Sequence, residues 1–117
     1  MIDYDQLNLI ARDVYDNACN KGFHDNENDE STVQAMARHT ANLHGEVSEL
    51  WEAARRGELE TPCDKDVFLT CIEEELADII IRAMDTALVF GVDIGSAVKN
   101  KHEYNKTRPH KHGGKLA

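Results

Sequence analysis

The chain has 117 residues, of which 41% are hydrophobic and 30% charged, with 7 Gly and 2 Pro. This length and composition indicate one folded domain over residues 1–117 and exclude a disordered chain. No apolar run approaches the roughly 18 residues of a membrane helix, and the N-terminus has neither a basic start nor an apolar run, so neither a membrane span nor a signal peptide is expected. Cys19, Cys63 and Cys71 have no paired spacing and are expected to be reduced cytoplasmic thiols.

The net charge of −9 is unevenly distributed. Residues 99–115 carry six Lys or Arg against one acid, a balance of +5, which leaves −14 for residues 1–98. Such an acidic surface repels a polyanion, so no nucleic-acid polymer is expected as a partner. The split is typical of a site where cations sit on carboxylates and a basic tail, residues 106–117, meets the phosphates of a small ligand. A solvated basic tail is the alternative.

Apolar residues recur every three or four positions and no stretch alternates with period two, so four helices are predicted. The first covers about residues 4–19, with an apolar face of Leu7, Ile10, Ala11, Val14 and Ala18. A polar loop follows over residues 20–30. The second helix begins at Ser31, which with Gln34 has the spacing of a helix-start cap, and it ends near residue 56, before Gly57.

The third helix is predicted over residues 64–90. It is apolar nearly all round, so we expect it at the centre of the fold or at a subunit interface. Gly91 ends it, Asp93 caps a fourth helix that reaches about residue 105, and Pro109 forces an extended tail. These elements predict an all-α, four-helix bundle-like subunit.

The second helix carries two neighbouring stripes of side chains. Its predicted core stripe contains Met36, Thr40, Leu43, Val47, Leu50 and Ala54. A polar stripe, centred about 100° round the helix, contains His39, Asn42, Glu46 and Glu49. Because the two stripes adjoin, the acids are expected to point close to the core.

The third helix repeats this arrangement with Glu75 and Asp78, followed one turn later by Arg82, in the most hydrophobic part of the sequence. Ionised acids there would be costly, so we expect them to be neutralised by protons, arginine or bound cations. Two acid pairs present about eight oxygens, which suits Mg²⁺, with Mn²⁺ as a substitute. Solvated helix faces also carry such pairs, and a di-iron site is disfavoured because no Glu-x-x-His occurs.

Three motifs occur in order: Glu46-Val47-Ser48-Glu49, then Glu75-Leu76-Ala77-Asp78 after 25 intervening residues, then residues 104–113. Together they resemble the MazG-like all-α nucleoside triphosphate pyrophosphohydrolases, and Lys21-Gly22-Phe23 extends the likeness over nearly the whole chain. The resemblance implies a homodimer or homotetramer that hydrolyses a (deoxy)nucleoside triphosphate to the monophosphate and pyrophosphate.

The resemblance also implies roles for individual residues. Mg²⁺ would be held by Glu46, Glu49, Glu75 and Asp78. Phosphate contacts would come from Lys101, Asn105 and Arg108. From the chemistry of phosphoryl transfer, one of the four carboxylates is expected to orient or deprotonate the attacking water, and we favour Glu49, with Glu46 beside it. Further substrate contacts are expected from Lys21, His39 and Asn42. Residues 21–23 could instead form a loop that closes the end of the bundle. His39 and Asn42 could instead be a polar pair that packs between helices.

Two other functions remain open at this point. One is a related helical phosphohydrolase that acts on another diphosphate-bearing metabolite, of the phosphoribosyl-ATP type. The other is a non-catalytic oligomerisation module whose buried acids set the register of its partner. Release of pyrophosphate together with a simple nucleotide would favour the nucleoside triphosphate pyrophosphohydrolase over both of these alternatives.

Overall fold

The computed structural model describes residues 1–110, so the part of the predicted basic tail over residues 111–117 lies outside the described residues. Its elements are α1 (Asp5–Asn20), the short 3₁₀ helix η1 (Glu27–Asp29), α2 (Thr32–Arg55), α3 (Cys71–Val89) and α4 (Ile94–Thr107). Residues 1–110 form no β-strand, and their β-type backbone pairing is one isolated bridge between Pro62 and Thr70. The all-α class is therefore confirmed.

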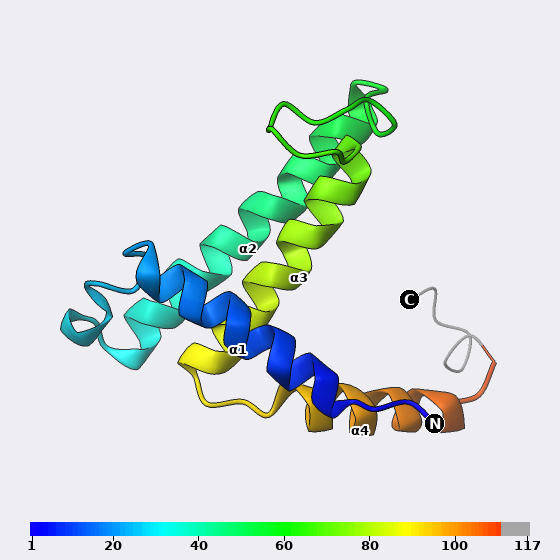
Figure 1. Ribbon diagram of the computed structural model, residues 1–117. Coiled ribbons are helices and arrows are strands. Elements are labelled where there is room, and N and C mark those ends of the chain that lie inside the picture. The colour runs from blue at the N-terminus through cyan, green and yellow to red at the C-terminus, as the bar shows by residue number, and fades with distance from the viewer. Residues whose placement is uncertain (111–117) are drawn as a thin grey trace.

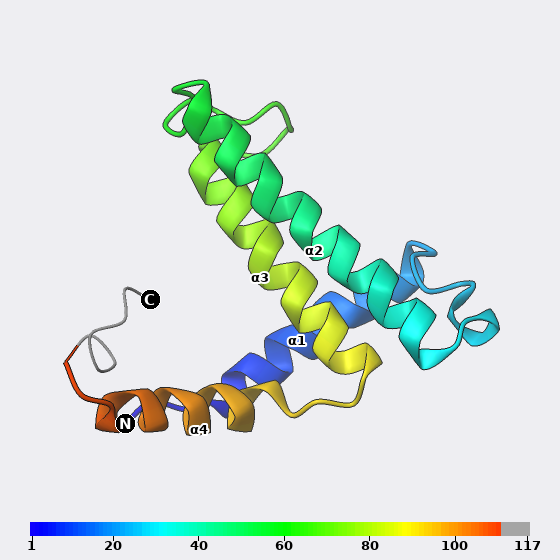
Figure 2. The ribbon, with the colours of Figure 1, turned by 180° about the vertical axis from the view of Figure 1, so that it is seen from behind.

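The helices form an open arrangement. Figure 1 shows α2 and α3 as an antiparallel hairpin, with α1 crossing one end of it. α4 packs against α1 and extends away from the hairpin, which is clearest from behind in Figure 2. The radius of gyration is 16.6 Å, against roughly 13 Å for a compact domain of this length. A single subunit therefore does not close into a bundle of four aligned helices.

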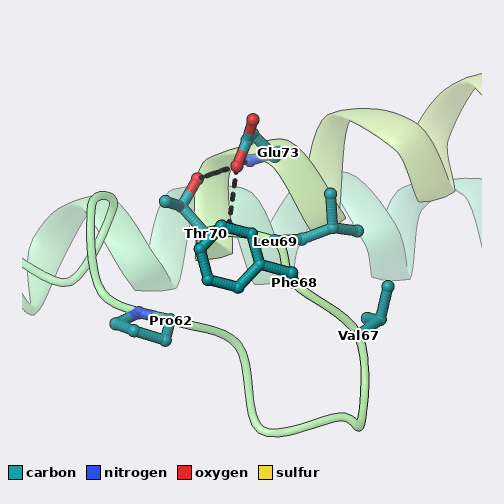
Figure 3. Close-up of a pocket in the computed structure, with 6 residues that line it drawn as sticks. All are labelled: Pro62, Val67, Phe68, Leu69, Thr70 and Glu73. Carbon is teal, nitrogen blue, oxygen red and sulfur yellow. Dashed lines mark hydrogen bonds between the residues drawn. The ribbon is translucent and has the colours of Figure 1, made fainter.

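Helix starts follow the local capping rules. The Ser31 hydroxyl accepts from the Gln34 amide and the Gln34 side chain accepts from the Ser31 amide, as the sequence predicts. The predicted start of the third helix at residue 64 is wrong, because a second capping box forms between Thr70 and Glu73. Figure 3 shows the Glu73 carboxylate accepting from both the amide and the hydroxyl of Thr70.

Residues 57–70 instead form an irregular loop at the far end of the α2–α3 hairpin. Cys63 donates its amide to the Leu69 carbonyl, and Cys71 donates to Thr61, so the loop folds back on itself. Figure 3 shows the apolar pocket that the loop forms with the first turn of α3, where Phe68 is fully exposed. None of the predicted site residues lines this pocket.

The predicted core stripe of the second helix is wrong for the single subunit. The buried residues of α2 are His39, which belongs to the polar stripe, and Ala35, one turn before it on the same face, whereas Met36 and Val47 are exposed. The helix periodicity shows which side chains share a face, but it does not show which face meets the next helix. In this fold the polar stripe meets α3. Of the apolar stripe, Met36, Thr40 and Val47 are exposed, whereas Leu43, Leu50 and Ala54 are half-buried.

Few side chains are fully buried in the described residues. The buried hydrophobic residues are Ala11, Ala35, Met84 and Ala87. Gly57 and Gly91 have positive φ angles of 69° and 68° and end α2 and α3, as the sequence predicts. Among the helices of residues 1–110, none is both long and apolar enough to cross a membrane.

The contact between α1 and α4 depends on Gly95. A Cβ atom at this position would lie 2.5 Å from the Tyr4 carbonyl oxygen, so we expect Gly95→Ala to destabilise the protein by about 1–3 kcal/mol. Gly45 is the matched control, because it lies inside α2 and an added Cβ atom would meet nothing within 4 Å. Gly45→Ala is expected to stabilise by about 0.5–1 kcal/mol. Urea unfolding of both variants is the measurement, and an unchanged stability of Gly95→Ala would contradict the predicted clash.

Candidate metal centre

Three acidic side chains meet in the α2–α3 hairpin. Glu46 comes from α2, and Glu75 and Asp78 lie three residues apart on α3. One carboxylate oxygen from each lies within 4.8 Å of the other two. We call these three residues the acid cluster. They meet because α2 and α3 pack against each other and the polar stripe of α2, which carries Glu46, faces α3.

The acid cluster contains buried oxygens without a partner. Glu75 is 8% exposed, and its Oε2 atom makes no hydrogen bond. Glu46 accepts from Arg82 through Oε1, at 3.3 Å from the arginine Nε, but its buried Oε2 is also without a partner. A buried polar atom without a hydrogen bond lowers the free energy of unfolding. A proton or a bound cation at each of these two oxygens would remove that penalty.

The acids also raise one another's pKa values. Burial, followed by contact with Glu49, raises the pKa of Glu75 to about 7. Burial and the charges of Glu49 and Asp78 raise the pKa of Glu46. The pKa of Asp78 is raised by burial and then by the charges of Glu74 and Glu49. A divalent cation would remove this shared penalty, and an all-oxygen donor set suits Mg²⁺ or Mn²⁺.

Glu49 lies at the edge of the cluster. It is the exposed member of the four predicted metal ligands, and its side chain contacts Glu75. It is not among the residues whose oxygens lie within 4.8 Å of one another. The structure thus brings together three of the four predicted ligands and places the fourth beside them.

A cavity of about 460 Å³ lies next to the cluster. It is lined by Glu46 and Asp78, by Arg82 and Asp85 further along α3, by Phe23 from the loop after α1, and by α1 itself. This volume is in the range of small-ligand sites. The part of α1 that faces the cavity includes Asp13 and Asn17, which the sequence reasoning missed. Their spacing of four residues beside Val14 and Ala18 was the available signal.

The predicted phosphate contacts on the fourth helix lie elsewhere. Lys101 and Arg108 contact the Tyr104 ring, with the Lys101 Nζ atom 4.8 Å from its centroid. None of Lys101, Asn105 and Arg108 lines the 460 Å³ cavity. A single subunit therefore does not bring these residues to the acid cluster. Lys21 is exposed and is also absent from the cavity wall.

His39 and Asn42 occupy the packed side of α2. His39 is 6% exposed, and its ring nitrogens lie 3.0 Å from Thr86 Oγ1 and 3.0 Å from Glu27 Oε1. Asn42 is half-buried and shares a cavity of about 30 Å³ with His39. Such a cavity is far smaller than a nucleoside site, so in this structure the two residues pack between helices.

The raised pKa of Glu75 predicts a pH dependence of stability in protein stripped of divalent ions. The unfolded chain ionises near pH 4.5, whereas folded Glu75 stays protonated up to about pH 7, so stability falls as pH rises through this window. Removing the charge by Glu75→Gln should therefore stabilise the protein at pH 8, by roughly 2–3 kcal/mol, and change little at pH 4. Urea unfolding in the presence of a chelator measures the difference.

Glu73→Gln provides the opposite control on the same helix. Hydrogen bonds from Thr70 lower the pKa of Glu73, so its charge stabilises the folded state above pH 4.5. This variant should lose stability at pH 8 and match the wild type at low pH. Equal losses in both variants would contradict the assignment of Glu75 as a strained acid.

Comparison of the chain with known protein families, with curated proteins and with solved structures gave no match. The likeness to the MazG-like pyrophosphohydrolases accordingly rests on the three sequence motifs and on the acid pairs that they contain.

Proposed function

We propose that the protein hydrolyses a (deoxy)nucleoside triphosphate to the nucleoside monophosphate and pyrophosphate in a Mg²⁺-dependent reaction. The observation that carries this proposal is the acid cluster, with its two partnerless buried oxygens, beside a cavity large enough for a nucleotide. The order of the two acid pairs and the basic segment, as in the MazG-like enzymes, supports the same substrate class.

A triphosphate would bind next to these carboxylates only together with a divalent cation, because both carry negative charge. A triphosphate is strongly negative, and the four carboxylates of the site would repel it. Bound to Glu46, Glu49, Glu75 and Asp78, Mg²⁺ would supply the charge neutralisation that phosphoryl transfer requires. Arg82 adds positive charge on the cavity wall, where its Nε atom also holds Glu46 in place.

Glu49 is suited to act as the general base. Its carboxylate is exposed at the edge of the acid cluster, in contact with Glu75, and so is free to accept a proton from a water molecule beside the cluster. In the proposed step, water oxygen attacks the α-phosphorus while Glu49 accepts a proton from it. The bond from the α-phosphorus to the bridging oxygen breaks, and the leaving pyrophosphate takes the electron pair.

The remaining substrate contacts would come from a second copy of the chain. Lys101, Asn105 and Arg108 would neutralise and hydrogen-bond the leaving pyrophosphate, but α4 points away from the hairpin of its own subunit. In a homodimer or homotetramer, α4 of one copy would be available to the hairpin of another.

The outer face of α2 supports such an assembly. Val33, Met36, Ala37, Thr40, Ala41 and His44 line an open depression on this face. Further along the same helix, Val47 and Trp51 are 47% and 65% exposed. Contiguous exposed apolar surface of this kind marks a contact between proteins, and a second copy would cover it symmetrically.

Activity is tested with a panel of standard and modified nucleoside triphosphates in Mg²⁺, with pyrophosphate release as the measurement. Glu75→Ala is expected to reduce release at least 100-fold, and Glu49→Gln by about 10²–10⁴-fold, the usual contribution of a general base. Glu52→Gln, three residues after Glu49 and outside the cluster, should retain activity. Inactivity on every nucleotide, with turnover of a phosphoribosyl-ATP type substrate, would favour the related phosphohydrolase instead.

The assembly is tested by light scattering. Wild-type protein should be a dimer or tetramer, and Met36→Glu should weaken association at least tenfold because it places a charge in the apolar depression. Glu60→Lys changes an exposed charge in the loop after α2 and should leave association unchanged. A monomeric wild type would overturn the proposed assembly.

A further inference from the structure

Within the described part of the chain, Arg82 is the one positively charged side chain on the wall of the 460 Å³ cavity. It comes from α3, one turn after Asp78. The same wall carries the carboxylates of Asp13, Glu46, Asp78 and Asp85. An anionic ligand that enters the cavity therefore meets a single cationic group from the subunit that forms it.

The ion pair between Arg82 and Glu46 is incomplete on both sides. The Nε atom of Arg82 donates to Glu46 Oε1 at 3.3 Å. Over residues 1–110, the two Nη groups of Arg82 donate no hydrogen bond to a protein atom. The Oε2 atom of Glu46 is buried and also has no partner. A guanidinium and a carboxylate can form two parallel hydrogen bonds, and this pair forms only one of them.

Arg38 shows the complete form of such a pair in the same protein. Its Nε and Nη2 atoms both donate to the Glu30 carboxylate, at 2.9–3.2 Å, and Nη2 also donates to Glu27. Arg38 does not line the 460 Å³ cavity, so it serves as a structural counter-ion. Arg82 differs in both respects, because it pairs through one nitrogen and lies on the cavity wall.

The two unused halves of the Arg82–Glu46 pair need ligands of opposite charge. The Nη groups are donors that match the oxygens of a phosphoryl group, which arginine binds through two hydrogen bonds. The Oε2 atom of Glu46 is an acceptor that matches a cation. A phosphate chain that carries a divalent cation offers both charges together, so one ligand would satisfy both side chains.

From this geometry we propose that Arg82 is a catalytic residue that binds the phosphate chain of the substrate through its two Nη groups. The inference rests on the proposed function for the nature of the reaction. Arg82 donates to the phosphoryl oxygens that leave as pyrophosphate, where negative charge grows as the bond to the α-phosphorus breaks. Its Nε contact with Glu46 holds the guanidinium beside the acid cluster while it does so.

The test measures the binding of inorganic pyrophosphate to full-length protein in Mg²⁺ by calorimetry. Pyrophosphate is the expected leaving group, it carries no base, and the proposed reaction does not hydrolyse it. Arg82→Gln should weaken its binding at least tenfold, because charge-assisted hydrogen bonds are lost. Arg55→Gln is the matched control, since Arg55 also pairs with a glutamate, Glu52, but lies outside the cavity. This variant should bind pyrophosphate as the wild type does.

Mn²⁺ binding without pyrophosphate separates a substrate contact from a structural counter-ion. Arg82→Gln should bind Mn²⁺ at least as tightly as the wild type, because it removes a positive charge beside Glu46. Its kcat on the best nucleoside triphosphate should nevertheless fall at least 100-fold. Arg82→Lys keeps a charge for Glu46 but cannot donate two parallel hydrogen bonds, so it should bind pyrophosphate less tightly than the wild type. Circular dichroism confirms that each variant folds.

Unchanged pyrophosphate affinity in Arg82→Gln would overturn the role of Arg82, as would a parallel loss of Mn²⁺ affinity or wild-type protein that binds no pyrophosphate in Mg²⁺. These results differ from a failure of the proposed function. Nucleotide hydrolysis that is unaffected in Arg82→Gln contradicts the role of Arg82 alone. A protein that hydrolyses no nucleotide, but whose pyrophosphate binding depends on Arg82, contradicts the hydrolase and retains Arg82 as a phosphate-binding residue.

Discussion

The helices α2 and α3 contact each other through a polar face that contains buried carboxylates. The exposed apolar surface of α2 and the small interior of the subunit follow from this contact. Glu46, Glu75 and Asp78 lie between two helices in place of the aliphatic side chains that usually fill such a contact. Their mutual repulsion is offset by the guanidinium of Arg82, which reaches Glu46 but leaves an oxygen of Glu46 and one of Glu75 without a partner. A contact built around buried carboxylates contributes less to stability than an aliphatic contact of the same size.

The exposed apolar surface is the direct consequence. Because α2 has turned its polar stripe inward, Met36, Val47 and Trp51 remain on the outside of the subunit. The interior of residues 1–110 is correspondingly small and is built largely from alanine and methionine. Burial of the outer face in an assembly would supply the hydrophobic free energy that the hairpin contact itself does not.

α3 carries two groups of polar side chains along its length. Its first turns carry Glu75 and Asp78 of the acid cluster, and its last turns carry Asp85, which faces His24. Arg82 lies between the two groups and lines the same cavity as both.

The local features of this protein could be predicted from short stretches of its sequence. The helix starts at Ser31 and Asp93 and the stops at Gly57 and Gly91 were predictable, because capping and positive φ depend on residues within a single turn. The two acid pairs were visible for the same reason, since a spacing of three places them on one helix face. The start of α3 was missed because apolar residues before Thr70 mimic helix periodicity, while loop hydrogen bonds to Thr61 and Leu69 hold that segment folded back.

The contacts between helices follow from the packing of the whole fold. It selected the polar stripe of α2 as the face that packs on α3, and it placed α4 on α1, away from the hairpin. It also joined His24, Glu27, His39 and Asp85, which lie up to 61 residues apart and share no motif. Periodicity fixes the angle of a side chain about its own helix axis, whereas contacts between elements depend on the total free energy of packing, which no local pattern contains.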